Sequence, residues 1–281
     1  FLSLSEENLQ KFCRKHPEID CDAQSILLSL GAAMYEGLTN LYSWTFLKLL
    51  HQVRDSLVGQ TPEERYDDFV NNCLNRDWQQ LQETGTLGRL VKERIRRTGN
   101  AIQEFFSRLD RDMGVVESIL GEPIRTLEQL KISAGDTHNG GRTVILLSVN
   151  QTEKIVYKPH CCSTDRILAE LYRWLNQHER VRVKLKHMDF LDAGDYGWQQ
   201  YIPHKPCENR KEAEDFMYRL GCLLFVTYLT NSNDLHMENL IACGAYPMLV
   251  DTETLAFNIM PFGGATKENQ TSWNQMLAAS V

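Results

Sequence analysis

Three oxygen-bearing side chains near the end of the chain are spaced as a site for phosphoryl transfer requires. Asp234 and Asn239 have the D-x-x-x-x-N spacing, and Asp251 follows further along, at the end of a short apolar strand. The first carboxylate can accept the proton of an attacking hydroxyl group, and the other two side chains can bind Mg²⁺. His236 lies beside the candidate base. Each part alone could be a helix cap or a turn, but their order and spacing favour a kinase-like catalytic loop.

A glycine-rich segment, residues 135–142 (GDTHNGGR), lies directly before a predicted strand. Its glycines allow a tight turn and a close approach to a phosphate group, for which the N–H groups near Gly140 and Gly141 form a suitable nest. The alternative is a hairpin turn, although a turn rarely needs Asp, His and Arg together. This signal is weak when it is taken alone.

Lys158 follows on a predicted strand downstream of that segment, within Val156–Pro159. A strand lysine after a glycine-rich hairpin can contact nucleotide phosphates as a point charge, whereas an isolated lysine is more often a surface residue. Glu170, on the next helix, is the candidate ion-pair partner of Lys158, and Glu179 is a second candidate. Residues 196–202 (YGWQQYI) would then connect two lobes and could bind adenine through the backbone, or they form a plain edge strand.

A second interpretation is a two-metal hydrolase site built from three pairs of side chains. The pairs are Asp136 with His138, Asp234 with His236, and Asp251 with Glu253. Such sites normally gather more His or Asp ligands, and this interpretation leaves Lys158 and Asn239 unused. The order of the elements therefore favours a phosphotransferase.

The first part of the chain, from residue 1 to residue 130, carries helical periodicity almost throughout. Residues 23–55 predict two helices broken near Gly37 or Asn40, and residues 87–116 predict another. Thr61, Pro62 and Glu64 form a capping-box signature for a helix start. A basic cluster lies between the apolar positions of the helix predicted for residues 87–116, and it indicates a solvated face or a docking surface for an acidic peptide. Its members are Arg89, Lys92, Arg94, Arg96 and Arg97.

The later residues predict strands and two further helices. Residues 143–149 and 154–157 predict a hairpin, 188–191 and 196–202 a second strand pair, and 247–250 a short strand. Residues 165–176 predict an amphipathic helix, and residues 211–230 a helix that is apolar on most sides and therefore buried. We expect an α+β fold in three parts, residues 1–130, 131–205 and 206–281.

Composition limits the classes of partner. The net charge of −7 argues against a general affinity for nucleic acid, and the longest apolar run, residues 220–229, is too short to span a membrane. The first residues lack the pattern of a signal peptide. The eight cysteines are scattered without a C-x-x-C pair, which predicts reduced thiols in a cytoplasmic protein.

Several long motifs, taken together, resemble the dehydratase domain of class II lanthipeptide synthetases, the LanM family. They are GDTHNGGRTV, VYKP, YGWQQYI, DLHMENLIA and PMLVDTETL, in this order, with a looser match through TPEERYDDF and EFFSRLDRD. The resemblance implies a two-lobed kinase-like core, related to lipid kinases, with a large helical region before it. It also implies phosphorylation of Ser and Thr in a precursor peptide with ATP and Mg²⁺, followed by elimination of the phosphate.

By this resemblance, each candidate residue takes a role. Asp234 and His236 belong to phosphoryl transfer, and Asp136 and His138 to elimination. The residues implied for ATP are Lys158, Glu170, Gly140 and Gly141, and those implied for Mg²⁺ are Asn239, Asp251 and Glu253. The implied substrate is a precursor peptide with a leader and a core rich in Ser, Thr and Cys.

The resemblance also implies a longer protein. In the family, an Arg and a Thr further downstream serve elimination, and a C-terminal LanC-like cyclase domain binds zinc. We therefore expect this chain to be a fragment without a zinc site, which could be inactive on its own. The alternatives are a phosphotransferase or pseudokinase without elimination, and a non-catalytic peptide-binding module.

Overall fold

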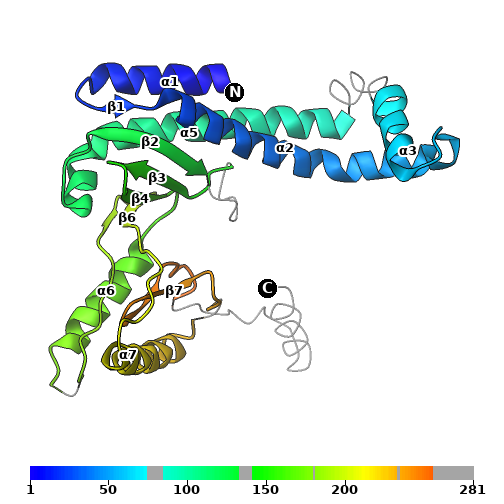
Figure 1. The fold of residues 1–281 in the computed structure, drawn as a ribbon. Coiled ribbons are helices and arrows are strands. Elements are labelled where there is room, and N and C mark those ends of the chain that lie inside the picture. Colours follow the sequence, from blue (N-terminus) through cyan, green and yellow to red (C-terminus); the bar gives the residue numbers. More distant parts are fainter. Residues whose placement is uncertain (75–84, 133–140, 180, 233–234, 256–281) are drawn as a thin grey trace, which may run out of the picture. The chain divides into compact units, whose positions relative to one another are not determined.

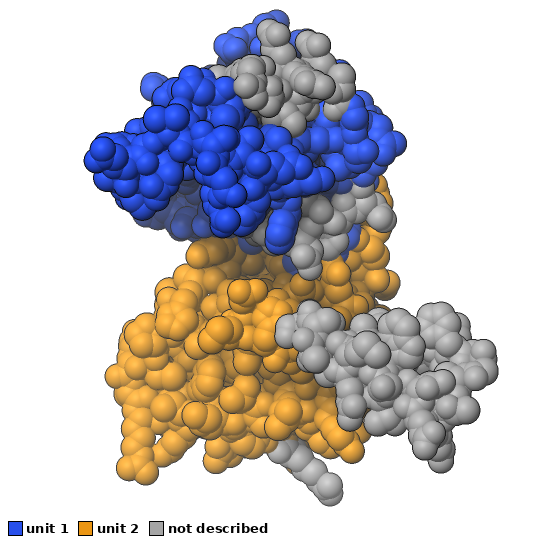
Figure 2. Space-filling view, turned by 90° about the vertical axis from the view of Figure 1, so that its right-hand side faces the viewer, with its two compact units in different colours: residues 1–160 blue, residues 161–281 orange. Residues whose placement is uncertain are grey.

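The computed structural model describes residues 1–74, 85–132, 141–179, 181–232 and 235–255. Contacts within the chain divide it into two compact units, Phe1–His160 and Cys161–Val281 (Figures 1 and 2). Both helices and strands are present, and the chain starts with a helical region. A mixed α and β architecture is therefore observed, whereas the kinase-like core and the division at residues 130 and 205 stay predictions.

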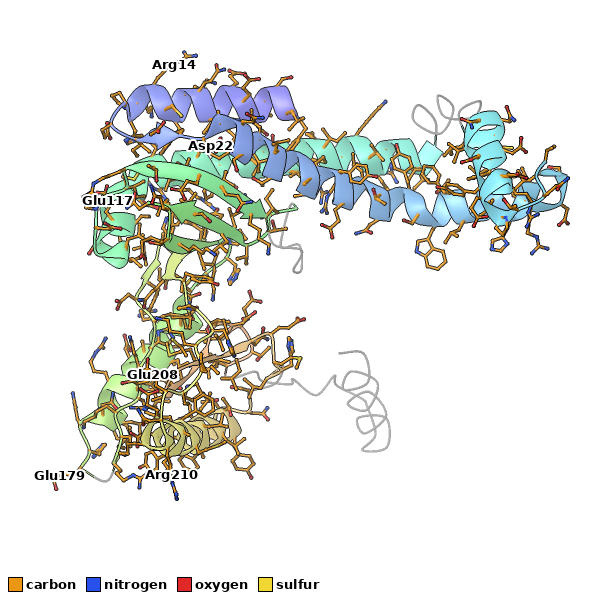
Figure 3. All side chains as sticks on the ribbon, viewed as in Figure 1. Arg14, Asp22, Glu117, Glu179, Glu208 and Arg210 are labelled. Atoms are coloured by element: carbon orange, nitrogen blue, oxygen red, sulfur yellow. The ribbon has the colours of Figure 1, made fainter. Side chains whose placement is uncertain are left out.

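Three helices form the core of the first unit: α1 (Leu2–Lys15), α2 (Ala23–Val53) and α5 (Gly85–Leu120). They pack against one another, with α2 also against strand β2 and α5 against strand β4 (Figure 1). Asp22, labelled in Figure 3, caps the start of helix α2, because its side chain accepts a hydrogen bond from the amide of Ser25 at 2.9 Å. The buried side chains between the helices include Leu9, Phe12, Ile26, Leu30, Ile102 and Phe106.

The predicted break in the second helix is wrong, because α2 runs without interruption from Ala23 to Val53. Gly37 has another use. A Cβ atom at this position would lie 3.1 Å from Nη2 of Arg94 on α5, so the glycine allows the guanidinium group to pack closely against the helix. Packing between helices, and not the end of a helix, accounts for this residue.

The capping box is confirmed. Helix α3 (Pro62–Asp68) begins after Thr61, whose hydroxyl group accepts the amide of Glu64 at 3.2 Å, and the Glu64 carboxylate accepts the amide of Thr61 at 3.3 Å. A short 3₁₀ helix, η1 (Arg54–Ser56), precedes α3, and a π-helical turn, η2 (Phe69–Leu74), continues it.

Four strands form the sheet of the first unit: β1 (Asp20–Cys21), β2 (Thr126–Ile132), β3 (Ile145–Val149) and β4 (Glu153–Lys158). β1 is parallel to β2, and the other pairs are antiparallel. The hairpin β3–β4 confirms the sequence prediction, with Ile145 opposite Tyr157 and Leu147 opposite Ile155. β1 and β2 were not predicted, since β1 is very short and β2 mixes polar with apolar side chains.

The second unit contains α6 (Ser163–Asn176), α7 (Arg210–Leu229) and two antiparallel hairpins. The hairpins are β5 (Phe190–Asp192) with β6 (Gly197–Gln200), and β7 (Leu240–Cys243) with β8 (Tyr246–Leu249). One apolar cluster joins α6, α7 and β8 through Leu168, Tyr172, Leu223, Val226 and Leu249. Of these elements, β7 was not predicted from the sequence.

Helix α7 is confirmed, but its predicted burial is wrong. Buried positions on this helix are Arg219, Leu223, Val226 and Thr227. Five large apolar side chains are between 61% and 81% exposed. Within the described residues of this unit only one side of the helix packs toward β8, so the side chains on its other side stay exposed. They are Met217, Leu224, Phe225, Tyr228 and Leu229.

Two further predictions concern the whole chain. All eight cysteines lie among the described residues, and none of them forms a disulfide. Within the described residues, no helix is both long enough and apolar enough to cross a membrane.

Candidate functional site

The hairpin β7–β8 brings two of the predicted metal ligands together. Leu240 pairs with Leu249, so Asn239 and Val250 flank the open end of the hairpin. The amide of Val250 donates a hydrogen bond to the carbonyl group of Asn239 at 2.9 Å, and Asp251 follows directly. The hairpin therefore brings the backbone of Asn239 close to that of Asp251, although eleven residues separate them in the sequence.

His236 lies in the turn before β7 and organises it. The amide of Asn239 donates to the carbonyl group of His236 at 3.1 Å, and the amide of Glu238 donates to Nδ1 of the ring at 3.2 Å. Nδ2 of Asn239 lies 3.5 Å from the other ring nitrogen, Nε2. Hence His236 contacts Asn239 twice, through its carbonyl group at the backbone and through its imidazole ring at the side chain.

Asp251 begins a turn of its own. Its Oδ1 accepts the amide of Glu253 at 3.1 Å, and the buried Thr252 donates its hydroxyl group to Thr164 on α6 at 3.0 Å. Asp251 is half-buried, whereas Glu253 is exposed. Of the two acidic residues, Asp251 is thus the one that the fold holds in place.

These residues suit Mg²⁺ by their chemistry. Mg²⁺ prefers hard oxygen ligands, and the amide oxygen of Asn239 and the carboxylate of Asp251 are of this kind. The contact between Asn239 and His236 uses the amide nitrogen and not its oxygen. Among the described residues, no group of three or more His, Cys, Asp or Glu side chains is placed to hold a metal ion.

Four of the predicted site residues lie outside the described residues. They are Asp136, His138, Gly140 and Asp234. Gly141 is described and has φ of +80°, a value that favours glycine. A Cβ atom on Gly141 would lie 3.2 Å from Cβ of Arg97, so the end of the glycine-rich segment packs directly on helix α5.

Lys158 is the last residue of β4 and is 5% exposed, which is unusual for a lysine. The strand enters the core through its alternate residues Ile155 and Tyr157, which are buried. A surface lysine is therefore excluded as the explanation of this residue.

Glu170 and Glu179, the predicted acidic partners of Lys158, are both exposed in the second unit. The buried carboxylate of α6 is Asp165, which is 1% exposed. Oδ1 of Asp165 accepts a hydrogen bond from Nε2 of Gln199 on β6 at 3.3 Å and lies 3.7 Å from Nε2 of His187. Sequence reasoning missed Asp165 because an aspartate in the first turn of a helix usually stabilises the helix end.

The predicted connector is strand β6 with its flanks. Tyr196 and Trp198 are buried, and Gln199 pairs with Phe190 of β5. The amide of Ala193 donates to the carbonyl group of Tyr196 at 2.9 Å, which closes the turn between the two strands. Adenine binding by this backbone stays a prediction.

Comparison with known proteins adds the family. The sequence profile of a family described as a domain of unknown function, DUF4135, matches residues 85–281. The chain belongs to the DUF4135 family. It is also 31% identical, over 225 residues, to the lacticin 481/lactococcin biosynthesis protein LcnDR2 of Lactococcus lactis subsp. lactis. The aligned region covers 73% of this chain and 23% of that relative, so the chain spans about a quarter of the relative's length. The resemblance to the LanM family is thereby confirmed for this portion.

The DUF4135 match contains every candidate site residue, from Asp136 to Glu253. It begins at residue 85, where helix α5 begins, and leaves α1 and α2 outside. Helix α5 is therefore part of the family's shared region together with the glycine-rich segment and both hairpins of the second unit.

The basic cluster of α5 favours the solvated-face interpretation. Arg96 and Arg97 both bind Glu93, at 2.7 and 2.6 Å. The bond from Arg96 has the larger effect, and together the two bonds lower the pKa of Glu93 to about 2. Arg94 packs against Gly37. Two of the five cations thus pair with a carboxylate of their own helix, and a third packs against helix α2.

Proposed function

We propose that this chain is the dehydratase portion of a lanthipeptide synthetase, which phosphorylates Ser and Thr of a ribosomal precursor peptide and then eliminates the phosphate. The relationship to a lantibiotic biosynthesis protein supports the pathway, and the arrangement of Asn239 and Asp251 supports the first step. A LanC-like cyclase domain in a longer protein stays a prediction.

In the first step, Asp234 accepts the proton of the peptide hydroxyl group as its oxygen attacks the γ-phosphorus of ATP. ADP leaves, and the peptide carries a phosphate ester. Mg²⁺, when bound by Asn239 and Asp251, neutralises charge on the phosphates. Lys158 binds a phosphate of ATP, and His236 keeps the amide side chain of Asn239 oriented.

In the second step, a base removes the α-proton of the phosphorylated residue. The electron pair forms the Cα–Cβ double bond, the Cβ–O bond breaks, and phosphate leaves, giving dehydroalanine or dehydrobutyrine. We assign proton transfer and stabilisation of the leaving phosphate to His138 and Asp136. Phosphorylation comes first because a hydroxyl group is a poor leaving group.

The single observation that carries the proposal is the closed site at the β7–β8 hairpin. Asn239 and Val250 flank the paired position Leu240 with Leu249, Asp251 follows Val250, and His236 binds Asn239 from the turn before it. Kinases hold Mg²⁺ with an Asn and an Asp, and a short hairpin that brings Asn239 and Asp251 near each other suits that use. A peptide-binding module without catalysis gives no reason for it.

Mass spectrometry tests the proposal directly. The protein, in its natural full length, is incubated with ATP, Mg²⁺ and synthetic candidate precursor peptides. Loss of one water per Ser or Thr supports the proposal, whereas gain of phosphate without loss of water supports a kinase that lacks elimination. No change in any peptide mass contradicts both and favours a binding module.

Variants assign the steps. Lys158→Ala and Asp251→Asn should abolish phosphate addition, whereas His138→Ala should leave a phosphorylated peptide. Glu238→Gln is the matched control, because Glu238 is exposed in the same turn as His236 and has no assigned role. If His138→Ala abolished phosphate addition as fully as Lys158→Ala does, the division between the two steps would be wrong.

A further inference from the structure

One carboxylate on helix α5 joins two segments of the first unit. Oε2 and Oε1 of Glu104 accept hydrogen bonds from Nε and Nη2 of Arg142, at 2.6 and 3.1 Å. The same Oε1 lies 2.7 Å from Nη2 of Arg108, one helical turn along α5. Two guanidinium groups therefore share Glu104, one from its own helix and one from the glycine-rich segment.

The second guanidinium group continues the network into the sheet. Nη1 of Arg108 donates to the hydroxyl group of Tyr157 at 2.5 Å, and both residues are buried. Burial raises the pKa of Tyr157, while the bond from Arg108 opposes that rise, so the phenol stays protonated near neutral pH. Glu104 thus reaches strand β4 through a single intermediate side chain.

The two segments carry residues that the proposed function requires. Arg142 and Gly141 end the segment that contains Asp136 and His138, and Gly141 packs on Arg97 of the same helix. Tyr157 directly precedes Lys158 on β4. Helix α5 consequently contacts the end of the glycine-rich segment at Arg142 and at Gly141. It contacts strand β4, which ends in Lys158, at Tyr157.

The space beside the network is too small for a nucleotide. A cavity of about 10 Å³ is lined by Thr98, Arg142 and Tyr157, among others. Such a volume admits about one water molecule. Arg142 binds Glu104 through two of its nitrogens, so its role here is to anchor the segment and not to receive a substrate.

We propose that Glu104 is a positioning residue, which fixes the glycine-rich segment for elimination through Arg142 and supports the Lys158 strand through Arg108 and Tyr157. This inference rests on the proposed dehydratase function. Helix α5 is then a part of the catalytic unit, in agreement with its place inside the family match.

The expected consequence is unequal for the two steps. Displacement of a reacting group by about 1 Å can slow a reaction by as much as about 100-fold. Loss of the bonds to Glu104 frees Arg142, the last residue of the glycine-rich segment, and should slow elimination, which the proposed function assigns to Asp136 and His138 earlier in that segment. The Lys158 strand keeps its ladder to β3, so phosphoryl transfer changes less.

The experiment measures phosphorylated and dehydrated peptide over time in the full-length enzyme. Glu104→Gln should raise the ratio of phosphorylated to dehydrated peptide by about 10-fold or more. Glu104→Asp, which keeps the charge, should restore part of the normal ratio. Tyr157→Phe should raise KM for ATP about fivefold, the equivalent of one lost hydrogen bond, without raising the ratio.

Asp110→Asn is the matched control. Asp110 lies on the same helix, and its side chain has the same exposure of 28% as that of Glu104. It binds Lys15 and His16, which lie far from the glycine-rich segment in the sequence. This variant should leave the product ratio unchanged. Comparable melting temperatures of the Glu104 and Asp110 variants would separate positioning from general loss of stability.

Hydrogen–deuterium exchange supplies a readout that needs no substrate. Glu104→Gln should speed exchange in peptides that contain residues 141–144, and Asp110→Asn should not. An unchanged product ratio in Glu104→Gln, with normal dehydration by the wild type, overturns the inference alone. Absence of both phosphate addition and dehydration in the wild type overturns the proposed function, whatever the exchange data show.

Discussion

Thr252 donates a hydrogen bond from its hydroxyl group to the hydroxyl group of Thr164, with 3.0 Å between the two oxygens. Thr164 belongs to the first turn of α6, and Thr252 directly follows the candidate metal ligand Asp251. This bond, together with that between the Val250 amide and the Asn239 carbonyl group, fixes Asp251 on both sides along the chain. The site is therefore held in part by Thr164, a side chain that lies outside the motifs quoted from the sequence.

Replacing Thr252 by valine, which has a similar shape, should remove this bond and leave the site less well ordered. The expected loss of stability is about 1–2 kcal/mol. The concentration of Mg²⁺ that gives half-maximal dehydration should rise, because the turn with Asp251 is no longer fixed to α6. Thr252→Ser retains a hydroxyl group and is the control. Equal Mg²⁺ requirements in both variants and the wild type would contradict the prediction.

Replacing Arg219 by methionine should destabilise the second unit by about 2–4 kcal/mol. Arg219 is buried on α7 and donates to the carbonyl groups of Lys184 at 2.8 Å and Ala245 at 2.7 Å. Its guanidinium carbon also lies 3.9 Å from the ring centre of Tyr246. Without it, two carbonyl groups lose their donor, and the cation–π contact is lost. Denaturant unfolding measures the change.

Arg210→Met provides the comparison for this prediction. Arg210 begins the same helix (Figure 3), and its side chain is 92% exposed. Its bond to Glu214 is a surface ion pair, so the change should cost less than about 0.5 kcal/mol. A similar loss in both variants would show that Arg219 acts through helix propensity and not through its contacts.

Replacing Gln151 by glycine should stabilise the first unit by up to about 1 kcal/mol. Gln151 has φ of +68° in the turn between β3 and β4, a region that costs a side chain free energy. Asn150, with φ of +50°, gives the opposite expectation. Its side chain accepts the amide of Arg125 at 2.8 Å and donates to the carbonyl group of Pro123 at 2.8 Å. Asn150→Gly should therefore lower the melting temperature, while Gln151→Gly raises it.

Local signals in the sequence predicted the elements that depend on neighbouring residues. The capping box at Thr61, the β3–β4 hairpin and helices α6 and α7 follow from caps, turns and periodicity, and all are present. Features that depend on distant contacts were not predicted. Strand β1 exists because it pairs with β2, which is distant in the sequence, and Gly37 serves the approach of Arg94 rather than the end of a helix.

The same distinction applies to the site. His236, Asn239 and Asp251 lie close to one another in the sequence, so their spacing revealed them. Glu104 could not be found in this way, because its partner Arg142 belongs to a distant segment and nothing near Glu104 marks it as different from other helix carboxylates. Asp165 was missed for a related reason, since its partners Gln199 and His187 come from other elements.

Asp110 should make the first unit lose stability in acid. Lys15, at the end of α1, and His16, which follows it, bind the Asp110 carboxylate at 2.5 and 2.9 Å. The bond from Lys15 has the larger effect, and together the two bonds lower the pKa of Asp110. A carboxyl group whose pKa is lower in the folded state stabilises the protein above its unfolded pKa of about 3.9. This contribution is lost as the pH falls through the lowered value.

Asp110→Asn tests that sign. At pH 6 the free energy of unfolding of the variant should be lower than that of the wild type, by no more than about 1 kcal/mol. Ion pairs that are partly exposed contribute within this range. As the pH falls below about 4, the two proteins should converge, because the wild-type carboxyl group becomes neutral as well. In a Lys15→Met background the difference at pH 6 should shrink, since the main partner of Asp110 is gone. A difference that persists unchanged at pH 2 to 3 would mean that the asparagine disturbs packing and that charge is not the cause.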